Sequence, residues 1–263
     1  TSSYSQSDYN GFGVSCNGYT DGSIDLTVAG GVDSQNYTYT WSNSATSEDL
    51  NSLGAGTYSV VVNDNNGCNT SETVVITEAD SLTSSFTTSD WNGFEVQCNG
   101  GDNGEIVLSV LGGVTGQFYS YTIDGASHPS NIFSNLTEGT YVVSSTDVNG
   151  CATSEIVSMT EPTTAITSSF TQSDYNGFGV SCNGDTDGSI DLTVDGGLLP
   201  YSFAWSNSAT SEDLNGLGAG TYSVVVNDNN GCTTTETVVI TESVALTSSY
   251  SQSDYNGFGV SCN

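Results

Sequence analysis

The 263-residue sequence contains no lysine and no arginine, against 30 aspartate and glutamate residues, so its formal net charge is −30. Nucleic acid is excluded as a partner, because phosphate binding requires cationic side chains. Anionic membrane surfaces are disfavoured for the same reason. The absence of lysine also excludes Schiff-base chemistry and lysine isopeptide cross-links, and the absence of both residues leaves no cleavage site for a trypsin-like protease. The negative charge must therefore be spread over the surface and screened by salt or bound cations.

Other features needed for catalysis or membrane insertion are scarce. The only histidine is His128, and the sequence has no nucleophile elbow and no phosphate-binding loop. Paired carboxylates can hydrolyse glycosides, but a repeated array offers no single cleft, so we expect no enzyme activity. With no apolar run long enough to cross a membrane, no signal peptide and no initiator methionine, the sequence is typical of an excerpt from a longer secreted protein.

A seventeen-residue segment organises the whole chain. Thr1–Asn17 (TSSYSQSDYNGFGVSCN) recurs unchanged at Thr247–Asn263, and looser copies occupy Thr83–Asn99 and Thr167–Asn183. Successive copies therefore start about 80 residues apart, which is the length of a small domain rather than of a solenoid turn. The spacing predicts three modules and the opening segment of an incomplete fourth: residues 1–82, 83–166, 167–246 and 247–263.

The residue pattern within a module is that of β-structure. Ile24, Leu26 and Val28 alternate with polar residues, as in a half-buried strand. Seven or so short strands, with a turn signal roughly every ten positions and no helical period, predict an all-β fold. We expect tandem immunoglobulin-like β-sandwich modules, each with one disulfide, in an elongated array. Tyr58, which follows Leu-x-Ala-Gly-Thr, predicts a tyrosine corner, where a phenol hydroxyl bonds the backbone at the crossing between sheets.

The three tryptophans fall in two kinds of position. Trp41 and Trp205 share the inward period of a strand with tyrosines, so we expect both in the core. Trp91 takes the place of Tyr9 beside an Asn-Gly turn, a strong hairpin signal. An exposed Trp91 could stack on sugars, as aromatic residues do in carbohydrate-binding modules.

Seven cysteines occupy two recurring places in the modules. In an oxidising compartment this recurrence predicts a disulfide inside each module, and closing a loop of about 50 residues contributes about 4 kcal/mol. Zinc is disfavoured, since there is no Cys-x-x-Cys spacing and only one histidine. The predicted pairs are Cys16–Cys68, Cys98–Cys151 and Cys182–Cys232, with Cys262 paired to a partner beyond the chain end.

Two weaker patterns concern ligands and modification. In the third module Asp185, Asp187 and Asp191 place oxygen donors at alternate positions, as a calcium loop does, and the first module keeps Asp21 and Asp25. A β-turn followed by a strand explains the same residues without metal, so both interpretations stay open and no cofactor is required. The tripeptide Asp-Ser-Leu at residues 80–82 fits a pattern at which some bacteria attach O-glycans, which would fall on Ser81.

The motifs follow one another in a fixed order: VSCNG, TDGSIDLTV, GG, a tyrosine-rich strand ending in WSN, SATSEDL, LGAGTYSVVVNDNNGC and TETVVITE. This order resembles the SprB-type repeat of secreted adhesins in gliding bacteria. The resemblance covers Val14–Glu78 and Val180–Glu242, and more loosely Val96–Glu161, where Ile123 replaces the Trp41 equivalent and Val107 the Asp25 equivalent.

The resemblance implies an extracellular repeat protein of a bacterial cell surface, exported by the secretion system of such adhesins and associated with attachment and surface motility. It supplies no catalytic or ligand-binding residues. The favoured function is a structural and adhesive rod, stalk or filament, and the alternative is an array of modules that bind carbohydrate or another surface. The expected partners are a surface or glycan ligand, or further copies of the chain in a filament, with no nucleic acid and no direct membrane insertion in this segment.

Overall fold

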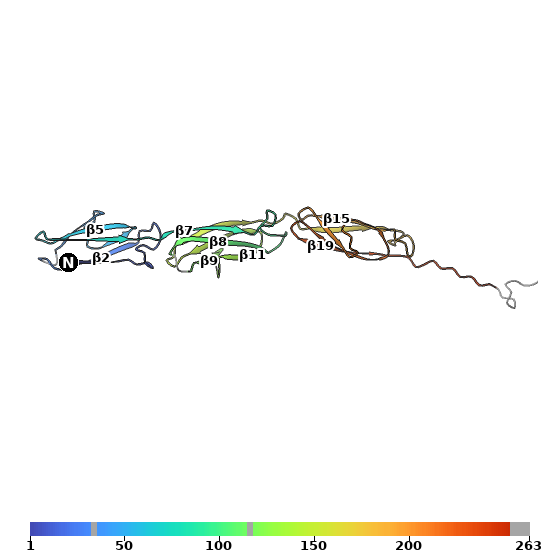
Figure 1. The fold of residues 1–263 in the computed structure, drawn as a ribbon, viewed down its shortest axis with the longest axis horizontal. Coiled ribbons are helices and arrows are strands. Elements are labelled where there is room, and N and C mark those ends of the chain that lie inside the picture. Colours follow the sequence, from blue (N-terminus) through green and yellow to red (C-terminus); the bar gives the residue numbers. More distant parts are fainter. Residues whose placement is uncertain (33–35, 115–117, 253–263) are drawn as a thin grey trace, which may run out of the picture. The chain divides into compact units, whose positions relative to one another are not determined.

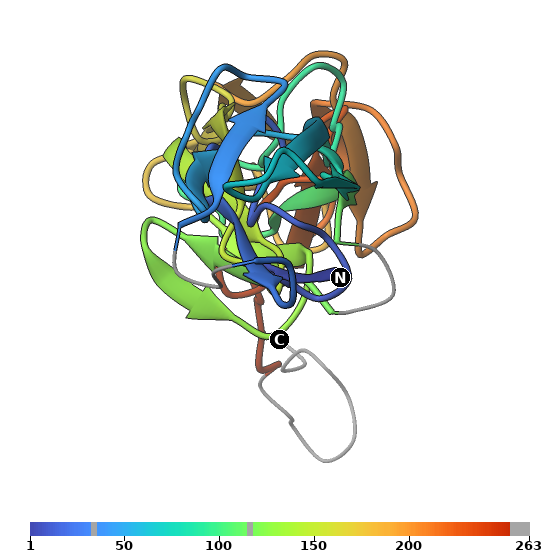
Figure 2. The same cartoon turned by 90° about the vertical axis from the view of Figure 1, so that its left-hand side faces the viewer.

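A computed structural model describes residues 1–32, 36–114 and 118–252. Every regular element in this part of the chain is a β-strand, and Figures 1 and 2 show strands and loops without coiled ribbon. Among the described residues, no helix has the length and hydrophobicity needed to cross a membrane. The all-β prediction is confirmed. Cys262 and most of the predicted opening segment at 247–263 lie outside the described residues.

The first module is a sandwich of two antiparallel sheets with three strands each. One sheet has the order β1-β2-β4 and the other the order β3-β5-β6, so the chain changes sheets after β2, β3 and β4. This is the strand exchange of an immunoglobulin-like sandwich. The strands are β1 (Ser2–Gln6), β2 (Gly22–Val28), β3 (Thr38–Trp41), β4 (Leu50–Leu53), β5 (Gly56–Asn63) and β6 (Asn69–Ile76).

The second module repeats this arrangement with one additional strand. Its sheets have the orders β11-β8-β7 and β10-β9-β12-β13. The extra strand β10 pairs with β9 through an Asp124-Gly125 turn whose φ angles of 48° and 80° are those that a tight hairpin requires. The strands are β7 (Asp80–Thr88), β8 (Gly104–Gly113), β9 (Ser120–Ile123), β10 (Ala126–His128), β11 (Ile132–Leu136), β12 (Gly139–Thr146) and β13 (Ala152–Met159).

The third module returns to the six-strand plan of the first, with sheets ordered β14-β15-β17 and β16-β18-β19. The strands are β14 (Thr167–Gln172), β15 (Gly188–Asp195), β16 (Ser202–Trp205), β17 (Leu214–Leu217), β18 (Gly220–Asn227) and β19 (Thr233–Ile240).

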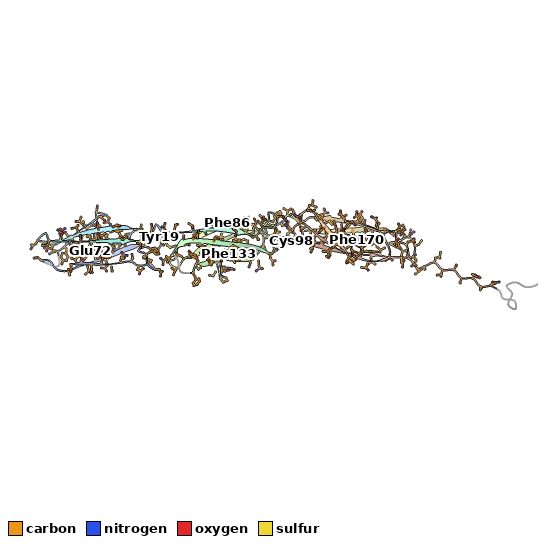
Figure 3. All side chains as sticks on the ribbon, viewed as in Figure 1. Tyr19, Glu72, Phe86, Cys98, Phe133 and Phe170 are labelled. Atoms are coloured by element: carbon orange, nitrogen blue, oxygen red, sulfur yellow. A yellow bond between two sulfur atoms is a disulfide. The ribbon has the colours of Figure 1, made fainter. Side chains whose placement is uncertain are left out.

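Each module has a separate apolar core between its two sheets. Ile24 and Leu26 are buried on β2, as their alternation predicts, and Phe133 is buried in the second module (Figure 3). Trp41 is 2% exposed and Trp205 4%, which confirms both as core residues. Each indole Nε1 still has a partner, because it donates to a backbone carbonyl six residues further on at 2.9 Å.

The tyrosine corner is confirmed in all three modules. The Tyr58 hydroxyl donates to the carbonyl of Gly54 at 3.1 Å, and Tyr141 and Tyr222 make the same bond four residues back, each at 3.1 Å. Each tyrosine lies near the start of the strand that follows the crossing between sheets, so the bond fixes the direction in which the chain enters that strand.

Serine and glutamate side chains join the edges of the two sheets. In the first module the Ser2 hydroxyl on β1 donates to Glu72 on β6 at 2.7 Å (Glu72 is labelled in Figure 3). The equivalent bonds link Ser84 to Glu155 at 2.7 Å and Ser168 to Glu236 at 3.1 Å. A half-buried carboxylate that meets no lysine or arginine is thus stabilised by a hydroxyl donor.

The chain divides by packing into two compact units. The first consists of residues 1–96 and 102–160, and therefore contains the first two modules. The second consists of residues 97–101 and 161–263. The five-residue segment 97–101 is thus packed with the third module although the sequence places it in the second. This segment contains Cys98.

Candidate functional site

Two disulfides join cysteines of successive modules. Cys16 is bonded to Cys151 with a Cα–Cα distance of 5.6 Å, and Cys98 (labelled in Figure 3) is bonded to Cys232 with a Cα–Cα distance of 5.8 Å. In each bond the first cysteine of one module meets the second cysteine of the next. Cys68 and Cys182 are free and exposed. The predicted pairs within modules are therefore wrong: Cys16–Cys68, Cys98–Cys151 and Cys182–Cys232.

The reason is that the two cysteines of one module lie at opposite ends of a strand. Cys68 immediately precedes β6, whereas the segment leading to Cys16 is bound beyond the other end of β6, where Thr77 O accepts from Gly13 N at 2.9 Å and Val14 N at 3.2 Å. Nine residues of extended chain span about 30 Å. A disulfide requires Cα atoms within about 7 Å, so a bond inside the module cannot form.

A loop of sequence Asp-x-Asn-Gly-Cys, here called the cysteine loop, holds the second cysteine of each module at residues 64–68, 147–151 and 228–232. In the second module the Asp147 carboxylate accepts the N–H groups of Asn149 at 3.0 Å and Cys151 at 2.9 Å. It also accepts the N–H of Val114 at 3.0 Å, next to the glycine pair that ends β8. One carboxylate therefore fixes both the loop and the adjacent turn.

The same three bonds recur in the other two cysteine loops. Asp228 accepts from the backbone of Asn230, Cys232 and Leu198 at 2.9, 2.8 and 2.9 Å. Asp64 accepts from its equivalents Asn66, Cys68 and Val32 at 2.9, 2.9 and 3.2 Å. The loop around the free Cys68 thus has the hydrogen bonds of the two loops that carry disulfides.

The asparagine of the cysteine loop binds the residue that precedes the first cysteine. Asn149 Nδ2 donates to Ser15 O at 3.0 Å, and Asn230 Nδ2 donates to Gln97 O at 3.0 Å. Gln97 returns a bond from its Nε2 to Asn230 O at 2.6 Å. Each disulfide is therefore accompanied by an amide–carbonyl hydrogen bond between the two segments that carry its cysteines.

A pair of glycines next to the cysteine loop packs closely against the segment that leads into the first strand of the module. In the second module a Cβ atom on Gly112 would lie 2.1 Å from Ser81 O, and one on Gly113 would lie 2.9 Å from the Leu82 side chain. Both glycines have positive φ, at 81° and 65°. Only glycine therefore allows this close approach.

In the third module Ala165 and Ile166 close over Gly196 and Gly197 in the same way, and Ile166 is buried. In the first module nothing lies within 4 Å of a Cβ atom on Gly30, and one on Gly31 would meet the Asp64 side chain at 2.9 Å.

The aspartates predicted to bind calcium have other partners in the structure. Asp21 accepts the N–H of Ser15 at 3.0 Å together with its hydroxyl, and these hydrogen bonds, the hydroxyl first, lower the pKa of Asp21. Asp187 accepts the N–H of Ser181 at 3.1 Å, and hydrogen bonding from Ser181 likewise lowers the pKa of Asp187. These carboxylates position the residue that precedes the first cysteine.

The remaining members of the predicted calcium set do not converge. The Ser181 hydroxyl donates to Asp185 at 2.7 Å, while Asp25 on β2 and Asp191 on β15 are exposed. In the described part of the chain, no three histidine, cysteine, aspartate or glutamate side chains form a group suited to a metal. Calcium binding stays a prediction.

Two further predicted positions are exposed. Ser81 lies on β7, and glycan attachment there stays a prediction. Trp91 is 37% exposed at the tip of a tight hairpin, in which it exchanges two backbone hydrogen bonds with Phe94 at 2.7 and 3.2 Å. The hairpin confirms the Asn-Gly turn signal, because Asn92 and Gly93 both have positive φ, at 53° and 93°.

These observations define a tandem repeat protein of immunoglobulin-like β-sandwich modules with disulfides between successive modules. The sequence profile of the SprB repeat matches the chain at residues 14–46, 95–127 and 180–210. Each of the three modules therefore contains one match to the SprB repeat. Each match contains the first cysteine of its module and ends before the second.

Several solved structures are weakly similar. The N-terminal eight Ig domains of Down syndrome cell adhesion molecule share 11% identity, cover 78% of this chain and 32% of their own, and give a TM-score of 0.34. Surface layer protein SbsC, domains 1–6, shares 14% identity over 94% of this chain and 41% of its own, with a TM-score of 0.26.

The complex of Dpr2 Ig1-Ig2 with DIP-Theta Ig1-Ig3 shares 9% identity over 85% of this chain and 94% of its own, with a TM-score of 0.27. This chain thus spans about a third of the DSCAM fragment. Likenesses this weak do not bear on function. A search of curated proteins found no match.

Disulfide mapping tests the pairing directly. Because the sequence has no trypsin site, the oxidised chain is digested with a protease that cleaves at acidic residues and analysed by mass spectrometry without reduction. We expect linked peptides that contain Cys16 with Cys151 and Cys98 with Cys232. A linked peptide that joins Cys16 to Cys68 would contradict the structure.

The carboxylate of the cysteine loop should contribute a pH-dependent part of the stability. Hydrogen bonds from the N–H of Val32 and then of Cys68 lower the pKa of Asp64 from its ordinary value of 3.8. A lowered folded-state pKa contributes stability above 3.8 that is lost as the pH falls through the lower value. Asp64→Asn should therefore lower the melting temperature near neutral pH, with the deficit shrinking below pH 3.8.

Asp25→Asn is the matched control, since it removes the same charge from an exposed position on β2. It corrects for the general relief of repulsion in this acidic chain on acidification. If the two variants melted alike at every pH, the role assigned to Asp64 would be wrong.

Proposed function

We propose that this chain is part of an extracellular, load-bearing adhesive protein, a rod, stalk or filament of a bacterial cell surface that serves attachment and surface motility. Three matches to the SprB repeat support this assignment, because such repeats resemble those of secreted adhesins. The disulfides support an extracellular location, since such bonds persist in oxidising compartments. The absence of lysine and arginine supports a surface that repels nucleic acid and anionic membrane.

The observation that carries the proposal is the overlap of the two disulfide-closed loops. One loop runs from Cys16 to Cys151 and the other from Cys98 to Cys232, so residues 98–151 belong to both. A pulling force therefore has a short covalent path: through the first disulfide, along residues 151 to 98, and through the second disulfide. The rest of the enclosed chain is shielded from the load.

This covalent path limits how far the protein extends when its modules unfold. The polypeptide from Cys16 to Cys232 passes through every position between them, whereas the path through both disulfides uses only positions 98 to 151. Paired cysteines inside each module would shorten each module separately and leave the links between modules under load. The observed pairing instead carries force across the links, which is the property that an adhesive stalk under shear requires.

Single-molecule force spectroscopy tests this load path. With about 160 residues removed from the path, at about 3.5 Å each, the fully extended oxidised chain should be about 560 Å shorter than the reduced chain. Cys16→Ser combined with Cys98→Ser should give the longer extension without reductant. Cys68→Ser combined with Cys182→Ser is the matched control and should extend like the unmodified oxidised chain, because both residues are free. Equal extension of oxidised and reduced chains would refute the load-bearing role.

Exposed aromatic residues on the opening hairpins favour a second candidate function, binding of carbohydrate. Trp91 is 37% exposed, and in the third module Tyr175 and Phe178 are each 39% exposed across the same hairpin turn. Aromatic faces presented on a rigid turn can stack on the apolar faces of sugar rings, which the core tryptophans cannot do.

A glycan array with the full chain tests this second function. Trp91→Ala should weaken binding about tenfold if an aromatic face worth about 1.4 kcal/mol is lost. Trp91→Phe keeps an aromatic face and should retain most of the binding. If no glycan binds, or if Trp91→Ala binds as well as the unmodified chain, carbohydrate binding through this hairpin is excluded.

A further inference from the structure

A surface pocket lies beside the opening hairpin of the first module. Its volume is about 260 Å³, and it is lined by Gln6, Ser7, Asp8, Gly11 and Phe12. Gln6 is the last residue of β1, and Phe12 lies on the returning arm of the hairpin, where it pairs with the arm that follows β1. The pocket is therefore bounded by the end of a strand and by a tight turn. Its volume is near the lower limit of small-molecule sites, about 300 Å³, which suits a ligand of one ring.

The third module has an equivalent pocket in the same place. It measures about 300 Å³ and is lined by the corresponding residues, Gln172, Ser173, Asp174, Gly177 and Phe178. Residues 6–17 and 172–183 have the same sequence, whereas the second module has Thr88 in the place of Gln6. The chain thus contains two copies of the pocket and one module with a natural substitution in it.

The hairpin that borders the first pocket is fixed by hydrogen bonds. Asp8 Oδ1 accepts the N–H of Gly11 at 2.6 Å, which closes the turn. The Ser7 hydroxyl binds backbone groups on both neighbouring segments. From the second module, Asn149 Nδ2 donates to Tyr9 O at 3.0 Å. The pocket is therefore present while the junction with the second module is formed, and its walls are ordered before a ligand arrives, which lowers the entropic cost of binding.

Two polar side chains in each pocket are available to a ligand. The Gln6 amide is exposed and makes no hydrogen bond within the described part of the chain. Asp8 uses Oδ1 in the turn, and no described residue donates to its Oδ2. Gln172 and Asp174 repeat this arrangement, and the adjoining Phe178 is 39% exposed. Each pocket therefore combines an amide, a carboxylate oxygen and an aromatic ring.

This combination of groups is suited to a neutral sugar ring. A carboxylate oxygen accepts hydrogen bonds, and an amide both donates and accepts them, as neighbouring sugar hydroxyls require. An aromatic ring can pack against the apolar face of the sugar. Acidic sugars are disfavoured, because the chain has a net charge of −30 and no lysine or arginine to pair with a second carboxylate.

We propose that the pocket beside the opening hairpin of the first module, and its equivalent in the third, each bind one neutral sugar residue. Asp8 and Gln6 bind its hydroxyls, and Phe12 packs against its ring. The inference rests on carbohydrate binding, the second candidate function, and differs from it in placing the ligand in the first and third modules instead of on Trp91.

Saturation-transfer difference NMR on the full chain tests the pockets. The probes are the methyl glycosides of glucose, galactose, mannose and N-acetylglucosamine, each titrated separately, and at least one should bind. Gln6→Thr combined with Gln172→Thr should raise its dissociation constant about fivefold, the effect of one hydrogen bond of about 1 kcal/mol. This variant should fold normally, because the second module already has Thr88 at the same position.

A second pair of substitutions tests the carboxylates. Asp8→Asn combined with Asp174→Asn keeps an oxygen that can accept the N–H of the turn, and it should raise the dissociation constant about tenfold through the loss of a charged hydrogen-bond acceptor. Asp25→Asn combined with Asp191→Asn is the matched control, because it removes the same charge from exposed positions on β2 and β15. Equal effects of the two pairs would overturn the proposal, since net charge alone would then explain them.

Trp91→Ala separates this inference from the function on which it rests. Binding that survives Trp91→Ala and falls with the pocket variants supports the pockets. Binding that falls with Trp91→Ala and survives the pocket variants would overturn the inference and leave the Trp91 hairpin as the carbohydrate site. If none of the glycosides binds, both the pockets and the carbohydrate function fail, whereas the load-bearing role is tested separately by force spectroscopy.

Discussion

The structure depends on carboxylates that are satisfied by backbone N–H groups, because no lysine or arginine is present to pair with them. Asp147 and Asp228 are each only 6% exposed and each accept three N–H bonds. A buried carboxylate without such donors would be strongly destabilising. By binding the cysteine loop and the glycine turn together, each aspartate shapes the surface that holds the segment leading into its module and the residue before the first cysteine of the preceding module.

The contacts between successive modules recur in the same form, separately from the contacts that stabilise each module. The sandwiches hold themselves together by separate cores, tyrosine corners and serine–glutamate bonds. Successive modules are joined by a disulfide, an asparagine–carbonyl contact and a segment that closes over two glycines. The negatively charged modules repel one another. Specific contacts of this kind allow successive modules to associate despite that repulsion.

Much of this structure can be predicted from the sequence. Alternation around Ile24 and Leu26 predicts a half-buried strand, Tyr58 predicts the corner, and the Asn-Gly turns predict the hairpins. The motif Asp-x-Asn-Gly-Cys also recurs three times, which predicts a loop of defined structure around the second cysteine. Its role is not evident from the sequence, because a turn alone explains Asp, Asn and Gly at such positions, and nothing local shows that the aspartate reaches the turn after another strand.

The sequence by itself determined the fold class, the repeat length and the two cysteine places, because these follow from local periodicity and turn chemistry. Only the tertiary structure decided which cysteines pair. Spacing along the chain suggests Cys16 with Cys68, but these cysteines lie toward opposite ends of strand β6, and nine extended residues span about 30 Å. A disulfide joins sulfurs that are close in space, and in this fold the nearest partner of Cys16 is Cys151, 135 residues away in the next module.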